Sequence, residues 1–153
     1  MDQAVRTHVV RGSLVRVKLW DRDEEGLEAV LSDLLARLAP RGIETSLDLD
    51  AAVNDLGLDE TELLYRVAQE GLRNVVEHAE ASHVSITIRS DGPTLLMSVA
   101  DDGRGVTSAP VPLRSGHFGL RALAGLADEL GATLDLESAP GRGTVLRVAV
   151  PMT

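Results

Sequence analysis

Residues 59–79 read DETELLYRVAQEGLRNVVEHA and carry the clearest helical pattern of the chain. Apolar side chains recur there at steps of three and four residues, which is typical of a helix with one buried face. Asp59 is predicted as the N-cap, with Glu62 three residues later completing a capping box. The same periodicity places Glu70 and Asn74, one turn apart, on a second stripe outside the apolar face.

On both sides of this helix the sequence alternates between strand and helix patterns. Helical spacing predicts a helix over residues 26–38 and another over residues 120–130, which Gly131 ends in a left-handed cap. Alternating apolar residues predict strands, which lie within residues 15–19, 43–49, 84–88, 95–99, 133–137 and 144–150. The order strand, helix, hairpin, helix, hairpin indicates an α/β fold, a two-layer α/β sandwich with a mixed sheet and helices on one face.

Composition excludes several classes of protein. The 153 residues carry a formal net charge of -9, without the clustered Lys and Arg that a nucleic-acid-binding surface needs. The sequence has no cysteine, which excludes disulfides and thiolate metal sites, and only 2% aromatic residues, which predicts an aliphatic core. No apolar run reaches the roughly 18 residues that cross a bilayer. We expect a cytoplasmic segment that contacts neither nucleic acid nor membrane.

Three glycine-bearing segments lie at the ends of predicted elements: residues 101–105 (DDGRG), 116–120 (GHFGL) and 141–144 (GRGT). Glycine lets backbone N–H groups approach a phosphate closely, and the second segment leads into a helix whose N-terminus favours an anion. Residues 102–119 as a whole lack any period and are predicted to form a long loop that acts as a lid. Taken singly, each glycine segment is more typical of an ordinary turn or cap.

Glu70 and Asn74 also allow two interpretations. A carboxylate and an amide one turn apart are typical of a solvated helix face. The same spacing also places two oxygen ligands on one side of a helix, which suits a hydrated magnesium ion and a nucleophile near a phosphate.

Residues 70–79, EGLRNVVEHA, resemble the N box of histidine kinases, and the glycine segments follow in the order of the G1 box, the G2 box and the final glycine motif. Over residues 43–151 the chain is similar to the ATP-binding catalytic domain of sensor histidine kinases, particularly the nitrate-sensor-like subfamily that works with LuxR-type response regulators. The resemblance implies the Bergerat ATP-binding fold of the GHKL superfamily, shared with gyrase, Hsp90 and MutL, with ATP and Mg2+ as ligands.

At the phosphate end of the implied site, the resemblance assigns catalytic roles to Glu70 and Asn74. Asn74 would hold the magnesium ion that bridges the ATP phosphates, and Glu70 would position or activate the attacking group. Gly119 and Leu120 would place a helix N-terminus beside the triphosphate. His78 is assigned to the same end of the site, with a structural role as the open alternative.

At the adenine end, the resemblance assigns Asp101 as the acceptor of a hydrogen bond from the adenine amino group. Gly103 and Gly105 would shape the pocket, and Thr144 would support it. His117 lies within the predicted lid and is assigned to the nucleotide site as a lid residue.

The histidine that such kinases phosphorylate has no recognisable motif in this sequence. We therefore divide the chain into residues 1–41, an N-terminal segment that resembles at most the tail of a dimerisation region, and residues 42–153, the ATP-binding catalytic domain. The implied function is to bind Mg-ATP and donate the γ-phosphoryl group to a histidine outside this chain. The implied partners are a dimerisation and histidine-phosphotransfer domain and, through a parent kinase, a response regulator of LuxR type.

Two alternative functions stay open, and so does the question of whether a parent kinase is anchored in a membrane. An anti-sigma-factor-type serine kinase uses the same fold on a partner protein. A degenerate module would sense nucleotide without chemistry, although Glu70, Asn74 and Asp101 are all present.

Overall fold

The computed structural model describes residues 4–10, 13–19, 26–50, 53, 56–104 and 118–152. Side chains are described from residue 26 onward within these ranges, apart from residues 78, 79 and 118–120. The loop and lid expected over residues 102–119 are therefore described only at their two ends. Residues 105–117 lie outside the described residues.

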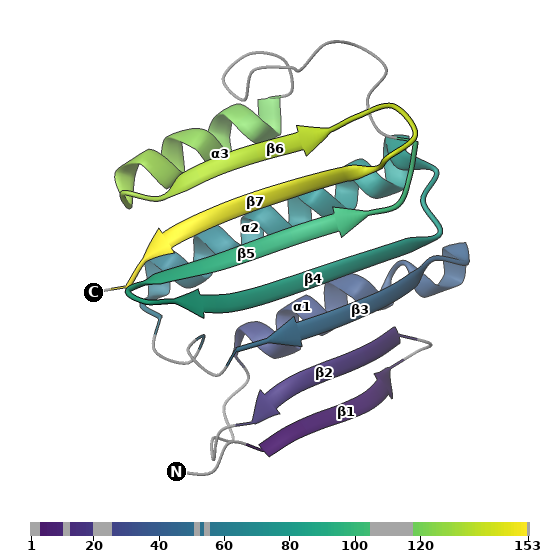
Figure 1. The fold of residues 1–153 in the computed structure, drawn as a ribbon, viewed down its shortest axis with the longest axis horizontal. Helices are drawn as coiled ribbons and strands as arrows, with labels where there is room; N and C mark the ends of the chain where they lie inside the picture. The colour runs from purple at the N-terminus through teal and green to yellow at the C-terminus, as the bar shows by residue number, and fades with distance from the viewer. Residues whose placement is uncertain are drawn as a thin grey trace.

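Within the described residues, seven strands form one sheet in the order β1-β2-β3-β4-β5-β7-β6 (Figure 1). The strands are β1 Ala4–Val10, β2 Ser13–Leu19, β3 Glu44–Leu49, β4 His83–Asp91, β5 Thr94–Asp101, β6 Thr133–Ser138 and β7 Thr144–Pro151. β2, β3 and β4 run parallel, and every other neighbouring pair is antiparallel. The predicted mixed sheet is confirmed.

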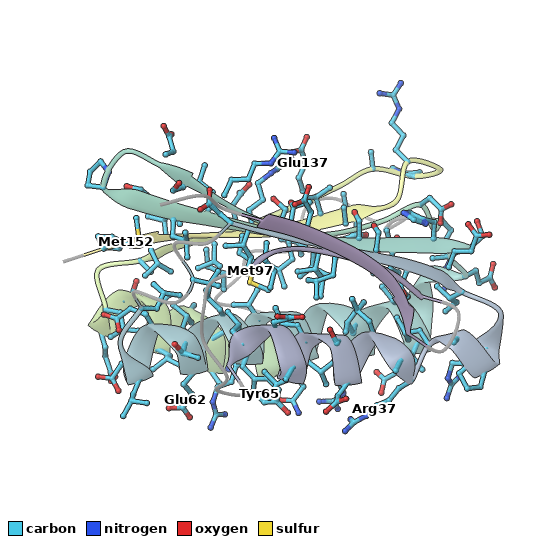
Figure 2. All side chains as sticks on the ribbon, turned by 90° about the horizontal axis from the view of Figure 1, so that it is seen from below. Arg37, Glu62, Tyr65, Met97, Glu137 and Met152 are labelled. Carbon is cyan, nitrogen blue, oxygen red and sulfur yellow. The ribbon has the colours of Figure 1, made fainter. Side chains whose placement is uncertain are left out.

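The helices cover one face of this sheet. They are α1 Leu27–Ala36, α2 Leu58–Asn74 and α3 Phe118–Glu129, with a short 3-10 turn η1 Ala39–Arg41 and a π turn η3 Val75–Ala79. Figure 2 shows Met97 between the sheet and the helices, Tyr65 on the helical layer and Glu137 on the opposite, open face of the sheet. The predicted two-layer sandwich is confirmed, and in the described ranges no helix combines the length and apolar character needed to cross a membrane.

The core is aliphatic, as the composition predicts, and α1 and α2 both contribute to it. Six α2 residues are buried, and they follow the helical spacing seen in the sequence: Leu63, Leu64, Val67, Ala68, Gly71 and Leu72. The strands contribute every second residue, for example Val84, Ile86 and Ile88 of β4. Burying these apolar side chains, at about 25 cal/mol per Å² of area removed from water, is the main force that holds α2 on the sheet.

The start of α2 differs from the sequence-based prediction. The helix begins at Leu58, with Gly57 as its N-cap residue and without a side-chain cap. The predicted capping box of Asp59 and Glu62 is therefore wrong. Asp59 lies in the first turn instead, where a carboxylate still interacts favourably with the helix dipole. Thr61 donates its hydroxyl hydrogen to the carbonyl oxygen of Gly57 at 2.8 Å.

The segment before residue 42 shares the sheet and the core with the rest of the chain. β1 was not predicted from the sequence, and it pairs with β2 at the sheet edge. α1 packs against α2 and β3, and its Leu31 and Leu35 are completely buried. The division of the chain at residue 42 stays a prediction.

Thr45 of β3 offers a test of this packing. Its side chain is 3% exposed, and its hydroxyl is buried without a hydrogen-bond partner. We expect Thr45→Val to raise the free energy of unfolding by about 1 kcal/mol, because it removes an unsatisfied polar group with little change in shape. Urea unfolding measures this, with Thr87→Val on the open face of the sheet as the control. A loss of stability in Thr45→Val, or an equal gain in both variants, would contradict the explanation.

Candidate functional site

Four element ends meet at one end of the sandwich, the right-hand end in Figure 1. α2 and β5 finish there, β4 and β7 start there, and α3 begins on the side facing it. Most of the residues singled out in the sequence lie on these ends. The fold therefore gathers segments that are 70 residues apart in the chain.

Close packing of α2 on β5 brings the helical residues to the strand that carries Asp101. A Cβ added to Gly71 would lie 2.9 Å from Cγ1 of Val99, so only glycine allows this approach without a shift. Val99 and Asp101 are two residues apart and therefore point to the same, helix-covered face. Glu70, the neighbour of Gly71, consequently lies on the part of α2 nearest the end of β5.

Glu70 is held on the helix surface with most of its side chain covered. The side chain is 14% exposed, and Nη1 of Arg73 lies 3.8 Å from its Oε2. Arg73 also contacts Glu77, with Nε 3.4 Å from Oε1. Asn74 is the partly buried last residue of α2, and the π turn η3 starts immediately after it. π turns within helices are often found at functional sites.

Asp101 is the last residue of β5, and its carboxylate is fixed by the turn that follows. Oδ1 accepts a hydrogen bond from the backbone N–H of Gly103 at 2.8 Å. Burial raises the pKa of Asp101 and the negative charge of Asp102 raises it further, while backbone hydrogen bonds from Gly103 and Thr144 oppose both effects. A half-buried carboxylate with backbone donors on one side is suited to accept a further hydrogen bond from a ligand.

β7 supports this carboxylate from the other side. Thr144 is the register partner of Asp101, and its hydroxyl lies 2.9 Å from the hydroxyl of Ser138 on β6. Gly143 adopts a φ of 74°, and a Cβ there would lie 2.0 Å from the carbonyl oxygen of Asp101. A side chain at residue 143 would therefore push the backbone of Asp101 out of place.

The structure brings some predicted site residues together and leaves others undescribed. Asp101, Gly103 and Thr144 form one hydrogen-bonded cluster, and Glu70 and Asn74 lie on the helix packed beside it. The predicted residues that lie outside the described residues are Gly105 and His117. Those described by their helical backbone without side-chain detail are His78, Gly119 and Leu120.

Sequence reasoning missed the contacts that hold the site in place. Ser138 supports Thr144, and Ser82 binds Asp102 through its hydroxyl at 2.7 Å. Serine near a strand end is common, so the sequence offers no local signal for either role. The Ser82 contact depends on the pairing of β4 with β5, because its two residues are 20 positions apart, and the Ser138 contact depends on the pairing of β6 with β7.

The described residues fit a magnesium ion that is held jointly with a phosphate ligand. In the described part of the chain, no three His, Cys, Asp or Glu side chains gather to form a metal site of their own. Magnesium typically keeps several waters and takes one or two protein oxygens together with substrate phosphates. The amide oxygen of Asn74 is suited to that limited role.

Residues 59–153 match the family described as Histidine kinase-, DNA gyrase B-, and HSP90-like ATPase. The chain belongs to this family. The matched residues extend from the first turn of α2 to the end of the chain and so contain every predicted site residue. The predicted kinase-like ATPase fold is confirmed.

Relatives of this ATPase-family chain are named as sensor kinases. UhpB of Salmonella typhimurium, a signal transduction histidine-protein kinase/phosphatase, is 32% identical over 144 residues, which cover 93% of this chain and 28% of UhpB. The sensor histidine kinase LiaS of Bacillus subtilis is 27% identical over 144 residues, which cover 94% of this chain and 39% of LiaS. The chain thus spans well under half the length of these relatives.

A solved structure shares the fold. The histidine kinase domain from the Erythrobacter litoralis EL346 blue-light activated histidine kinase superposes with a TM-score of 0.71 at 23% identity. The superposition covers 82% of this chain and 59% of that one. It supports the same arrangement of helices on one face of a mixed sheet.

The close approach at Gly143 can be separated from its backbone angle. Gly141 and Gly143 have φ angles of 75° and 74°, but a Cβ at Gly141 meets nothing within 4 Å. We expect Gly141→Ala to cost about 1 kcal/mol of unfolding free energy from the left-handed backbone alone. Gly143→Ala should cost about 3 kcal/mol, because it adds a clash with the backbone of Asp101. Urea unfolding compares the two variants, and equal losses would show that the clash is relieved at no cost.

Proposed function

We propose that this chain binds Mg-ATP and donates the γ-phosphoryl group to a histidine outside the chain, as the catalytic domain of a two-component sensor histidine kinase. The observation that carries the proposal is the half-buried carboxylate of Asp101, fixed at the end of β5 in a chain of the histidine kinase-like ATPase family. A carboxylate acceptor held in this way can select a base with an exocyclic amino group. Adenine has such a group.

The adenine end of the proposed site consists of Asp101 and the two segments packed against it. Gly103 is buried and donates its backbone N–H to Asp101, which fixes the carboxylate that would accept from the base. Gly143 and Thr144 bring β7 up to the same carboxylate. These residues bind and orient the base, and they leave the phosphates directed toward α2 and α3.

The phosphate end consists of Glu70, Asn74 and the start of α3. Backbone N–H groups at the helix N-terminus, which includes Gly119 and Leu120, favour the negative charge of a triphosphate. The amide oxygen of Asn74 would serve as a magnesium ligand. The chemistry that Mg2+ supplies when bound is neutralisation of the charge on the phosphate oxygens.

Phosphoryl transfer requires positioning and charge stabilisation more than covalent participation by the protein. The acceptor nitrogen forms a bond to the γ-phosphorus as the bond to the bridging oxygen breaks, and ADP leaves. Glu70 would orient the acceptor imidazole by a hydrogen bond to its N–H. Its largely covered side chain, restrained by Arg73, suits that role.

The proposed partners follow from the resemblance and from relatives that are named sensor histidine kinases. A dimerisation and histidine-phosphotransfer domain would present the acceptor. A response regulator, proposed to be of LuxR type, would receive the phosphoryl group through the parent kinase.

Calorimetry and a transfer assay test this function. We expect Asp101→Ala to weaken ATP binding at least about tenfold, because it removes a charge-assisted acceptor for the base. Glu70→Gln should bind ATP normally but slow phosphoryl transfer to a histidine-phosphotransfer domain about a hundredfold. Glu62→Gln, on the same helix and paired with the exposed Arg66, is the matched control and should change neither property.

The outcomes separate the alternatives. An unaltered chain that binds no ATP would contradict the proposal. Normal ATP binding without transfer to any acceptor would favour a nucleotide-sensing module. Acid-stable, base-labile phosphoprotein would indicate a serine acceptor, because phosphohistidine has the opposite stability.

The raised pKa of Asp101 predicts a pH dependence. Only the ionised carboxylate is the strong acceptor, so affinity is fully present above the folded-state pKa and falls as pH drops through it. Because that pKa lies above the ordinary aspartate value, the loss should begin at a higher pH than for an ordinary aspartate. Dividing the dissociation constant of the unaltered chain by that of Asp101→Asn, from about pH 7 to about pH 4, isolates this effect. A ratio that stays constant over this range would contradict it.

A further inference from the structure

The turn after β5 is fastened to the start of β4 by Asp102. Oδ1 of Asp102 accepts hydrogen bonds from the backbone N–H groups of Ser82 at 2.9 Å and His83 at 2.8 Å. Oδ2 accepts the hydroxyl hydrogen of Ser82 at 2.7 Å. The backbone N–H of Asp102 donates in turn to the carbonyl oxygen of His83 at 3.2 Å. The side chain of Asp102 therefore binds Ser82, which precedes β4, and His83, the first residue of β4, and its backbone binds His83 as well.

The same turn is held on its opposite side by the loop between β6 and β7. Gly141 donates its backbone N–H to the carbonyl oxygen of Arg104 at 2.7 Å. Gly143 lies against the backbone of Asp101. Asp102 thus supplies the β4 side of a two-sided support around Asp101 and Gly103.

We propose that Asp102 is a positioning residue for the nucleotide site, holding the turn in the conformation that presents the Asp101 carboxylate and the Gly103 N–H to the base. This inference rests on the proposed function. The carboxylate of Asp102 is bound to Ser82 and His83, so its effect on a ligand passes through the turn. Without its three side-chain bonds, the turn would be held on the β7 side and by one backbone bond to β4.

The charge of Asp102 gives this role a second readout. Hydrogen bonds from Ser82 and His83 lower the pKa of Asp102, so it stays ionised beside Asp101. Its negative charge raises the pKa of Asp101. The three hydrogen bonds that the ionised Asp102 side chain accepts are present above the ordinary aspartate pKa. They are lost only as pH falls through the lowered pKa of Asp102.

The far end of β4 offers a matched control. Oδ2 of Asp50 accepts the hydroxyl hydrogen of Ser90 at 3.0 Å and its backbone N–H at 3.5 Å. This pair joins Asp50, the residue after β3, to Ser90, the last but one residue of β4, at the end of the sheet opposite to Asp101. Asp50→Ala therefore removes similar aspartate–serine hydrogen bonds at a place away from the proposed site.

The test compares Asp102→Ala, Asp102→Asn and Asp50→Ala by ATP calorimetry, thermal unfolding and amide exchange of Gly103 in the ligand-free chain. We expect Asp102→Ala to weaken ATP binding about tenfold and to speed Gly103 exchange at least about tenfold, because the turn loses its anchor. Asp50→Ala should lower the unfolding temperature but leave both site measurements within about twofold of the unaltered chain.

Asp102→Asn separates geometry from charge. Its Oδ1 can still accept from Ser82 and His83, so affinity at neutral pH should stay within about threefold of the unaltered chain. Removing the charge should move the acid loss of ATP binding to lower pH, because the pKa of Asp101 falls.

Two results would overturn the inference. One is unchanged Gly103 exchange and ATP affinity in Asp102→Ala, and the other is an equal loss of affinity in Asp102→Ala and Asp50→Ala. If the unaltered chain binds no ATP, the proposed function fails and takes the nucleotide role of Asp102 with it. Gly103 exchange would still decide whether Asp102 holds the turn.

Discussion

Gly71, which has no side chain, sets the distance between α2 and β5 next to the end of β5 that carries Asp101. Any Cβ there would press on Val99, a β-branched residue with little freedom to move aside. With glycine, α2 lies close enough to β5 that Glu70 and Asn74 are carried to the strand end that bears Asp101. The apolar face of α2 supplies the binding energy for this contact, but Gly71 determines how close it is.

Two adjacent aspartates have opposite environments where β5 ends, Asp101 being its last residue and Asp102 the one after it. Asp101 points to the covered face, where burial disfavours its charge. Asp102 accepts three hydrogen bonds from Ser82 and His83 at the start of β4, and these favour its charge. One residue is thus available to a ligand, and the next is fully engaged in structure. The half-buried carboxylate of Asp101 lowers stability, and the hydrogen bonds that Asp102 accepts offset part of that loss.

The sequence predicted the elements whose signal is local. Helical spacing located α2, alternation located β2 to β7, and the residue types in 70–79 indicated the ATPase family. The prediction failed at the start of α2, where Gly57 takes the place that Asp59 was expected to fill, and at β1, where no strong alternation marks a strand. It also missed the contacts of Asp102, because a hydrogen bond across 19 or 20 residues leaves no periodic trace. The contact of Ser138 with Thr144 was missed because it depends on how β6 pairs with β7.

The site therefore depends on two kinds of constraint that differ in how they tolerate change. Apolar packing under α2 is spread over many side chains, so one substitution alters stability more than geometry. The turn at Asp101 is held by a few hydrogen bonds and one close backbone contact, so one substitution alters geometry directly. Phosphoryl transfer depends steeply on geometry. Variation at Asp102, Gly143 or Ser138 should therefore change nucleotide affinity more than variation of similar size in the core of the helical layer.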